Sequence, residues 1–279
     1  MSPEELSASA SDRLGSSPTA TPSQGPAAGD WTAILGLGTA CAIAYHLHRK
    51  GLANRTGPLD WFGSHHGETV ARLIRNRFES LFADRRSVEV VEDFKGYWKV
   101  MDTRNQVFTL HDFPIVGRKP KSLRRPPFGE RMRRVADRCL EPAWRWLPQL
   151  HFDGPNGVKV PLPSFPQFRR RVRRRAARHV RALENPGPLL VLRRARDPRE
   201  PPLIFEALRE IRGGAPTRLL VLADPDVLED IQPMPGVATA LLPPEDPGSD
   251  EPWRGRDDEW DHLLRGCRLS PTSPQETPC

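Results

Sequence analysis

Cys41 stands where a short apolar run gives way to a helical pattern, directly after a "GLGTA" segment. Residues 33–37 predict a buried strand and residues 39–50 a helix, with Thr39 as its N-cap and Gly51 as its C-terminal stop. A thiol in the first turn of a helix lies at the positive end of the helix dipole, which lowers its pKa from about 8.5. The free N–H groups there could also stabilise an oxyanion. Cys41 is therefore a candidate nucleophile, with a small apolar core residue as the alternative.

A thiol nucleophile needs a base, and His111 is the best placed of the eight histidines. The apolar runs on either side of "DTRN" predict a β-hairpin, and His111 closes its second strand. His46 and His48 share the predicted helix of Cys41, but we expect them on other parts of its surface. Like any lone histidine, His111 could instead be a structural residue.

A third group should orient the imidazole, and the sequence offers two. Asp112 is adjacent to His111, but successive strand side chains point to opposite faces, so it reaches the ring only if the strand ends there. Asp60, in the loop motif "GPLDWFG", is the alternative, and it could also be an ordinary turn-forming aspartate.

The same glycines allow a different chemistry. Gly36 and Gly38 supply two of the three glycines of a G-x-G-x-x-G dinucleotide motif between a strand and a helix. Cys41 occupies the third position, and Asp60 follows in a loop rather than at a strand end. A nucleotide or nucleotide-sugar binding protein is thus an alternative, whereas the thiol chemistry requires no cofactor.

A basic segment suggests a binding surface. The chain has a formal net charge of +7, and residues 118–183 hold the excess of basic side chains. Apolar residues recur through its last part at helical spacing, which predicts an amphipathic helix with a basic face. Such a face is either simply solvated or a site for an acidic ligand; nucleic acid is less favoured, because aromatic residues are not interleaved. The arginines of this basic surface are Arg169, Arg170, Arg171, Arg173, Arg174, Arg175 and Arg178.

The remaining pattern predicts an α/β fold. Residues 68–83 have the apolar spacing of an amphipathic helix, and from residue 188 apolar runs alternate with helical segments, as in βαβ units with a parallel sheet. We expect a mixed β-sheet with a central hairpin, flanked by helices. The ends, 1–31 and 267–279, are poor in large apolar residues and predict disordered tails around a single domain, 32–266. This domain divides into a Cys/His half (32–116), a basic helical segment (117–185, which includes a short helix at 129–139) and a βαβ-like half (186–266).

Composition limits the compartment and the metal chemistry. The four cysteines show no CxxC spacing, so we expect neither a disulfide framework nor a metal site, and a reducing cytoplasm is the simplest setting. The apolar run at 31–47 is shorter than the roughly 20 residues of a spanning helix, and the acidic "SPEEL" start is unlike a secretory signal.

Five motifs in order carry a resemblance to a known family: "LGLGTACAIAYHLHRKGL", "GPLDWF", "HDF", "LLVLRR" and "DDEWDHLL". Together they resemble a bacterial family of unknown function described as papain-like cysteine peptidases, over residues 34–264. The resemblance implies a catalytic pair at Cys41 and His111, in the papain-like chain order of cysteine before histidine. The leading hypothesis is therefore a thiol hydrolase or acyl-transfer enzyme acting on an amide, ester or thioester; the alternative is a non-catalytic module with a basic binding surface.

Overall fold

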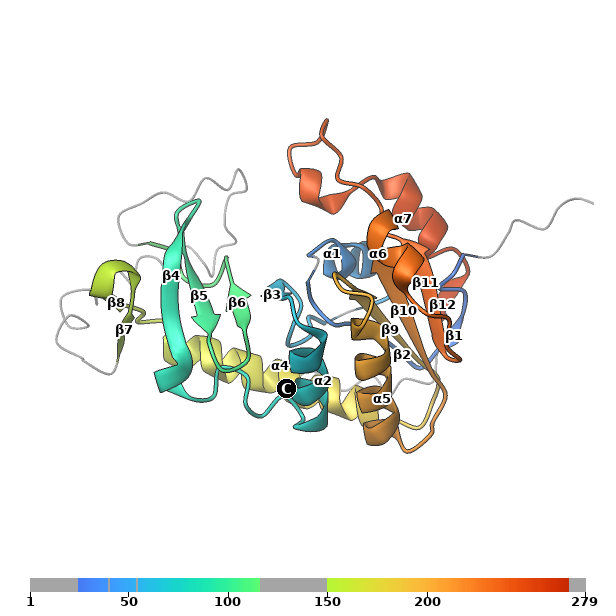
Figure 1. Ribbon diagram of the computed structural model, residues 1–279, viewed down its shortest axis with the longest axis horizontal. Helices are drawn as coiled ribbons and strands as arrows, with labels where there is room; N and C mark the ends of the chain where they lie inside the picture. Colours follow the sequence, from blue (N-terminus) through green and yellow to red (C-terminus); the bar gives the residue numbers. More distant parts are fainter. Residues whose placement is uncertain (1–24, 40, 54, 116–149, 271–279) are drawn as a thin grey trace, which may run out of the picture.

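The computed structural model describes residues 25–39, 41–53, 55–115 and 150–270 as a four-stranded and a six-stranded β-sheet, with a separate two-stranded sheet and helices packed between and around them (Figure 1). The expected α/β class, with mixed sheets, a hairpin and flanking helices, is confirmed. The expected disorder of 1–24 and 271–279 lies outside the described residues. Strand β1 (Gly29–Trp31) pairs in parallel with β12 (Cys267–Leu269), so the folded region begins before residue 32 and continues past residue 266.

The first sheet is parallel, in the order β11-β10-β9-β2. Its core strands are almost wholly apolar because helices cover both faces. On β9, Leu189 and Val191 pack in one apolar cluster, while Leu190 and Leu192 pack in the other, with α1 and α7. The sheet is made of β2 (Ala33–Gly36), β9 (Leu189–Arg194), β10 (Thr217–Ala223) and β11 (Val237–Leu241), and the predicted βαβ pattern is confirmed by α5 (Glu200–Arg212) and α6 (Pro225–Asp230).

The second sheet has the order β3-β6-β5-β4-β7-β8 and is antiparallel except between β4 and β7. The predicted hairpin is β5–β6, which pairs Asp102 with Val107 around the turn. The strands are β3 (Phe62–Ser64), β4 (Val88–Phe94), β5 (Tyr97–Asp102), β6 (Val107–Thr109), β7 (His151–Asp153) and β8 (Lys159–Pro161), with short 3-10 turns η1 (Arg85–Ser87) and η3 (Pro155–Gly157).

Helix α2 (Gly67–Arg75) is shorter than the sequence predicted. The apolar pattern at 68–83 does not continue as one helix, since Arg77, Phe78 and Phe82 have positive φ and the chain turns sharply. Phe78 and Phe82 are nevertheless buried, and the Phe82 N–H donates to Asp102 Oδ2 at 2.6 Å. The buried carboxylate thus satisfies the Phe82 N–H, while other N–H groups of the turns, such as that of Phe78, donate to nearby backbone carbonyls.

The other helices cover the two sheets from different sides. Helix α4 (Phe165–Glu184) runs horizontally below the antiparallel sheet in Figure 1 and continues past α2 to α5, which it contacts. Helix α1 (Cys41–Arg49) and α7 (Asp257–Leu263) pack on the parallel sheet, and the 3-10 turn η4 (Pro252–Arg254) contacts α1. Among the described residues, no helix is long and apolar enough to cross a membrane. The short helix expected at 129–139 lies outside the described residues.

Arg193 joins the two sheets. Its side chain, on β9, is 1% exposed and donates to the Leu37 carbonyl at 2.8 Å, just after β2. It also donates to the Ser64 carbonyl at 2.7 Å and to Ser64 Oγ at 2.8 Å, at the end of β3. Glu200 at the start of α5 neutralises it at 2.8 Å. One buried guanidinium therefore fixes the strand ends that flank the turn before Cys41.

Candidate active site

Cys41 is the first residue of α1 and lies beyond the carboxyl end of β2, the edge where open parallel sheets place their sites. Gly38 and Thr39 in the preceding turn both have positive φ, +72° and +70°. The Thr39 N–H donates to the Phe62 carbonyl at 3.2 Å and its hydroxyl to the Ser64 carbonyl at 2.7 Å. Thr39 therefore ties the turn to β3. A β-branched residue in this conformation is strained, and such strain gathers at functional sites.

Asp60 lies next to this turn and is buried. Its Oδ2 accepts the Gly57 N–H at 2.7 Å, and a Cβ built on Gly36 would come within 2.8 Å of Oδ1. Burial raises the pKa of Asp60 to about 6, while the Gly57 hydrogen bond opposes the shift. Asp60 is therefore a carboxyl group that changes charge close to neutral pH.

The packing of Asp60 also accounts for the glycines of the dinucleotide-like motif. A side chain at Gly36 would collide with the Asp60 carboxylate, and one at Gly38 with the Leu59 carbonyl and Ser64 Oγ. Both glycines make room for groups of the chain itself. A carboxylate over the first glycine is moreover the wrong charge for a phosphate cradle.

The Cys41 thiol is less acidic than its position at a helix start predicted. Burial raises its pKa to about 11, the negative charge of Asp60 adds to the rise, and the helix N–H group lowers it only in part. The sequence argument considered the dipole alone and could not include the burial or the neighbouring carboxylate. At neutral pH the thiol is protonated, so a reaction through its thiolate needs a proton acceptor.

His111 and Asp112 lie at the same end of the β3–β6 strand pair as Asp60. The two strands are antiparallel with Phe62 opposite Thr109, so the chain before β3, with Asp60, and the chain after β6, with His111, leave the pair at one end. The strand ends before Asp112, as its use as an orienting residue requires. This brings the predicted base and both predicted acids to one end of the strand pair, although no hydrogen bond joins Cys41 to His111 in the described part of the chain.

The surroundings of His111 connect it with Asp112. The His111 side chain is exposed, and its ring meets Tyr97 edge to face at 5.9 Å between centroids. Partial desolvation lowers the pKa of His111, and the Asp112 charge opposes that shift. Asp112 itself accepts the Thr109 hydroxyl at 2.5 Å and forms an ion pair with Arg171. His111 is thus a predominantly neutral imidazole with an anchored carboxylate beside it.

The basic run on α4 is divided between the interior and the surface. Arg171 pairs with Asp112, and Arg175 is half-buried, where the charges of both Asp112 and Asp60 act on it. Arg169 and Arg178 are also half-buried. The solvent-exposed members of the run are Arg170, Arg173 and Arg174.

Sequence reasoning missed two histidines near Asp60. His48 lies seven residues after Cys41, nearly two full turns, and so shares its face of α1, contrary to our expectation. The charge of a protonated His48 lowers the Asp60 pKa. The spacing alone could have identified it.

His179 on α4 is the second missed histidine. It is 3% exposed, and its Nδ1 would lie 3.2 Å from a Cβ built on Gly57, the residue that also holds Asp60. Its Nε2 has no hydrogen-bond partner in the described structure, and burial lowers its pKa to about 3. No local signal marks it, since it lies within the apolar stripe of an arginine-rich helix.

Comparisons with known proteins identify the family of the chain. The chain belongs to the family described as "Putative papain-like cysteine peptidase (DUF1796)", whose profile matches residues 32–204 and so includes Cys41, Asp60, His111 and Asp112. It is also 29% identical over 99 residues to an uncharacterized protein of Acanthamoeba polyphaga mimivirus, a match that covers 30% of this chain and 44% of that protein. The bacterial source expected for the family stays a prediction, because this relative is viral. No solved structure matches the chain.

Proposed function

We propose that this protein is a cysteine hydrolase or acyl-transfer enzyme that attacks an amide, ester or thioester through Cys41. The observation that carries the proposal is the half-buried thiol at a helix start, on the carboxyl edge of a parallel sheet and within the charge field of Asp60. Membership of a family described as cysteine peptidases makes a peptide amide the first substrate class to test.

In the proposed reaction, His111 takes the Cys41 proton as sulfur attacks the carbonyl carbon. The lowered pKa of His111 supports this role, because the imidazole is neutral and able to accept a proton at pH 7. The oxyanion of the tetrahedral intermediate would be stabilised by N–H groups at the start of α1. His111 then protonates the leaving group, and water or another nucleophile releases the acyl group from sulfur.

The two candidate acids fit different tasks. Asp112 lies beside His111, its charge raises the pKa of that ring, and both its oxygens are anchored, so we assign it the orienting role. Asp60 acts on the thiol and opposes its ionisation. We assign Asp60 the role of keeping Cys41 protonated until a base and substrate are in place.

The test compares Cys41 with Cys267 in the same protein. Cys267 is also half-buried, and burial raises its pKa to about 11 as well, but it lies on β12 away from the proposed base. We expect iodoacetamide to modify Cys41 at least tenfold faster than Cys267 at pH 7.5. Hydrolysis of a panel of peptide, ester and thioester substrates should be lost in Cys41→Ala and His111→Ala and kept in Cys267→Ala. Equal alkylation of both thiols, with unchanged turnover in Cys41→Ala, would refute the proposal.

Both thiols are free in the described structure, which supports a reducing compartment such as the cytoplasm as the place of action.

A second function remains as an independent candidate. The exposed side chains of Arg170, Arg173 and Arg174 form a basic strip on α4. Within the described residues, none of the three forms an ion pair with an acidic side chain, so the strip is available to bind an acidic ligand.

A further inference from the structure

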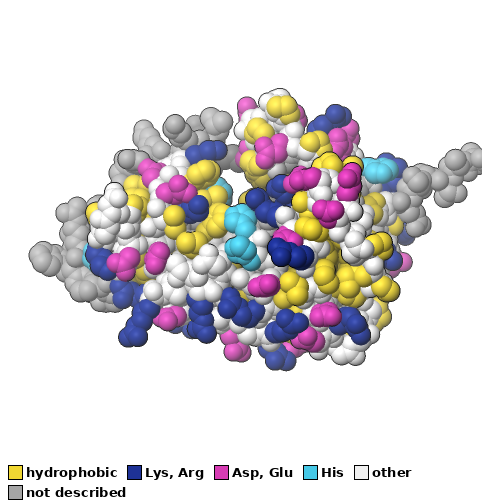
Figure 2. All heavy atoms as spheres, viewed as in Figure 1, with side chains coloured by type: hydrophobic (Ala, Val, Ile, Leu, Met, Phe, Trp, Pro, Cys, Tyr) yellow, Lys and Arg dark blue, Asp and Glu magenta, His cyan; other side chains and the backbone are white. Residues whose placement is uncertain are grey.

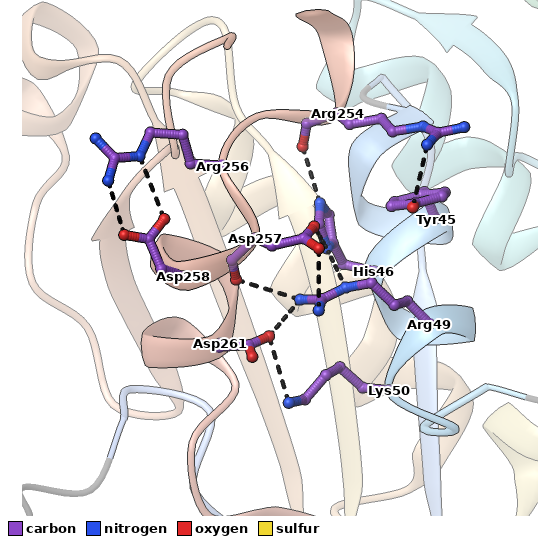
Figure 3. A network of polar contacts seen from close by, with 9 residues as sticks. All are labelled: Tyr45, His46, Arg49, Lys50, Arg254, Arg256, Asp257, Asp258 and Asp261. Atoms are coloured by element: carbon purple, nitrogen blue, oxygen red, sulfur yellow. Dashed lines mark hydrogen bonds and ion pairs between the residues drawn. The ribbon is translucent and has the colours of Figure 1, made fainter. Parts of the chain in front are cut away.

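The C-terminal part of the chain is fixed onto the helix that begins with Cys41 (Figure 3). His46 is fully buried on α1; its Nε2 lies 2.8 Å from the Arg254 carbonyl and its Nδ1 accepts from Arg49 Nε at 3.1 Å. The two contacts define the tautomer, since a carbonyl can only accept and Arg49 can only donate. The ring also stacks on Trp260 with centroids 4.5 Å apart.

Ion pairs extend this attachment along α1. Arg49 pairs with Asp257 at 3.4 Å and with Asp261, and Lys50 reaches Asp261 at 3.3 Å. These contacts hold η4 and the first turns of α7 against α1, as Figure 3 shows. The position of η4 relative to the Cys41 helix is therefore determined by several independent contacts.

This attachment places aromatic and cationic groups together. The Arg254 guanidinium lies 4.2 Å from the centre of the Tyr45 ring, and its Nη1 donates to the Tyr45 hydroxyl at 3.2 Å. The Trp253 ring meets Tyr45 edge to face at 5.9 Å and Trp61 in the same way at 5.8 Å. Trp253 therefore touches two aromatic side chains from two different elements.

Those two elements are the ones that carry the proposed reactive groups. Tyr45 lies one helical turn after Cys41 and on the same face of α1, and Trp61 directly follows Asp60. All three aromatic side chains are half-buried, so each leaves part of its ring accessible. Trp253 thus connects the helix of the thiol with the loop of its neighbouring carboxylate.

We propose that Trp253, Tyr45 and Trp61 form an aromatic subsite beside Cys41 that binds a large apolar or aromatic side chain of the substrate. This inference rests on the proposed function. The aromatic rings offer apolar area and ring edges, which favour another aromatic or aliphatic group. An acidic group is not favoured, because the guanidinium of Arg254 at this place already stacks on Tyr45 and pairs with Glu251.

The family match includes two of the three subsite residues but not the third. Tyr45 and Trp61 lie within the matched residues 32–204. Trp253 lies almost fifty residues beyond the end of that match. The side chain that completes the subsite is thus supplied from outside the matched region. We infer that Trp253 is a specificity-determining residue of this subsite.

Two alkylating probes of different size test the subsite. Iodoacetamide reports the intrinsic reactivity of Cys41, and N-benzyl iodoacetamide carries the same electrophile with an aromatic group that the subsite should bind. We expect the full chain to react about tenfold faster at Cys41 with the benzyl probe, measured by mass spectrometry of the modified peptide. Burial of most of one ring corresponds to such a factor. Cys267, measured in the same spectra, should show a ratio near one.

Substitutions assign the effect. Trp253→Ala should reduce the ratio of the benzyl-probe rate to the iodoacetamide rate at Cys41 to near one, and Trp253→Phe should keep part of that preference. Because Trp253→Ala removes a contact of η4, Trp61→Leu, which leaves the His46 network intact, serves as a second variant and should also lower the ratio. Unchanged ratios in both variants, or no benzyl preference in the wild type, would overturn the subsite. The ratio is measured however slowly Cys41 reacts, so a failure of the catalytic proposal is seen separately, in the absolute rate.

Discussion

The protonation of Cys41 shows how neighbouring residues outweigh a local rule. A helix dipole stabilises a charge at its end by about 0.3–1 kcal/mol, or up to about 2 in favourable sites. At Cys41, loss of solvent comes first and the Asp60 carboxylate second, and together they raise the pKa to about 11. The helix start was readable from the sequence, but the net sign required knowledge of what covers the thiol.

Asp60→Asn tests this account. The amide keeps the shape and can still accept the Gly57 N–H, but it removes the negative charge that opposes ionisation of the thiol. The Cys41 pKa should therefore fall, and alkylation by iodoacetamide at pH 8 to 9 should become several-fold faster. The measurement is the pH dependence of alkylation, with the unchanged Cys267 as internal reference. A profile identical to that of the wild type would show that Asp60 does not act on the thiol.

At the residue scale, sequence reasoning could use neighbours along the chain but not the packing that folding creates. Cys41, Asp60 and His111 were selected from turns and strand ends, and their roles stay predictions. The β3–β6 pairing brings the segments of Asp60 and His111 to one end of that strand pair. His48 was available from helical spacing. His179 was not, because only tertiary structure shows that a ring on α4 packs against Gly57.

At the scale of elements, the joint between the two sheets depends on one buried ion pair. Arg193 satisfies carbonyls after β2 and in β3, and Glu200 compensates its charge. Removing one member of such a pair leaves the other buried without compensation, at a cost of about 3–5 kcal/mol. Because the same contacts hold the turn before Cys41, the pair also positions the candidate nucleophile.

Arg193→Met should therefore lower the melting temperature by roughly 10 °C, a value that follows from about 2–4 °C per kcal/mol for a domain of this size. The matched control is Arg194→Met, the next residue, whose half-exposed ion pair with Asp224 is worth about 0–1 kcal/mol. Thermal unfolding followed by circular dichroism measures both. Equal, small effects would mean that the Arg193–Glu200 pair does not hold the sheets together.

The elements that the sequence predicted best are those whose apolar pattern is compatible with a single type of secondary structure. The βαβ half was predicted because strands buried on both faces are continuous apolar runs. The end of α2 was predicted wrongly, since Phe78, Leu81 and Phe82 are buried as a helix face would be, yet they lie in a series of turns. A pattern of buried residues does not specify the backbone conformation when a buried polar group, such as the Asp102 carboxylate, can accept a hydrogen bond from an N–H group of a turn.

At the scale of the whole molecule, the net positive charge is not one continuous field. Figure 2 shows basic and acidic side chains interspersed along the lower edge of the face in view. Arg171 on α4 pairs with Asp112, and the charges of Asp112 and Asp60 act on Arg175, so these two arginines are not free for an external partner. The sequence could locate the basic segment but not this division.

A triple substitution separates the two functions. Changing Arg170, Arg173 and Arg174 together to Gln should leave hydrolysis within about twofold of the wild type, because all three side chains point into solvent. If the strip binds an acidic ligand, the variant should leave a heparin column at clearly lower salt than the wild type, because three fewer cations displace counterions. Identical elution of both proteins would remove the binding-module hypothesis for this surface.

The pH dependence of stability should show two opposed groups packed on Gly57. Burial lowers the pKa of His179 to about 3, so its contribution is complete above pH 6.5 and is lost as the pH falls toward 3. Burial raises the pKa of Asp60 to about 6, so its contribution is complete below about 3.8 and is lost as the pH rises through 6. Near pH 5, Asp60 is protonated in the folded state and His179 in the unfolded chain, so both states bind the same number of protons at these two groups. The contributions of the two groups to the pH dependence of the free energy of unfolding therefore nearly cancel.

His179→Gln removes the contribution of His179 to the pH dependence of the free energy of unfolding. Relative to the wild type, the free energy of unfolding of this variant should rise by about 1.4 kcal/mol for each pH unit below 6.5, since it has no imidazole that must stay neutral in the core. Whatever packing the variant loses at pH 8 is a constant offset, so only the slope is diagnostic. Urea unfolding at pH 8, 7, 6 and 5 measures it, and His262→Gln on the exposed surface of α7 is the control for removing a histidine as such. If the curves of His179→Gln and the wild type run parallel, His179 is protonated equally in both states and the buried pair described above does not exist.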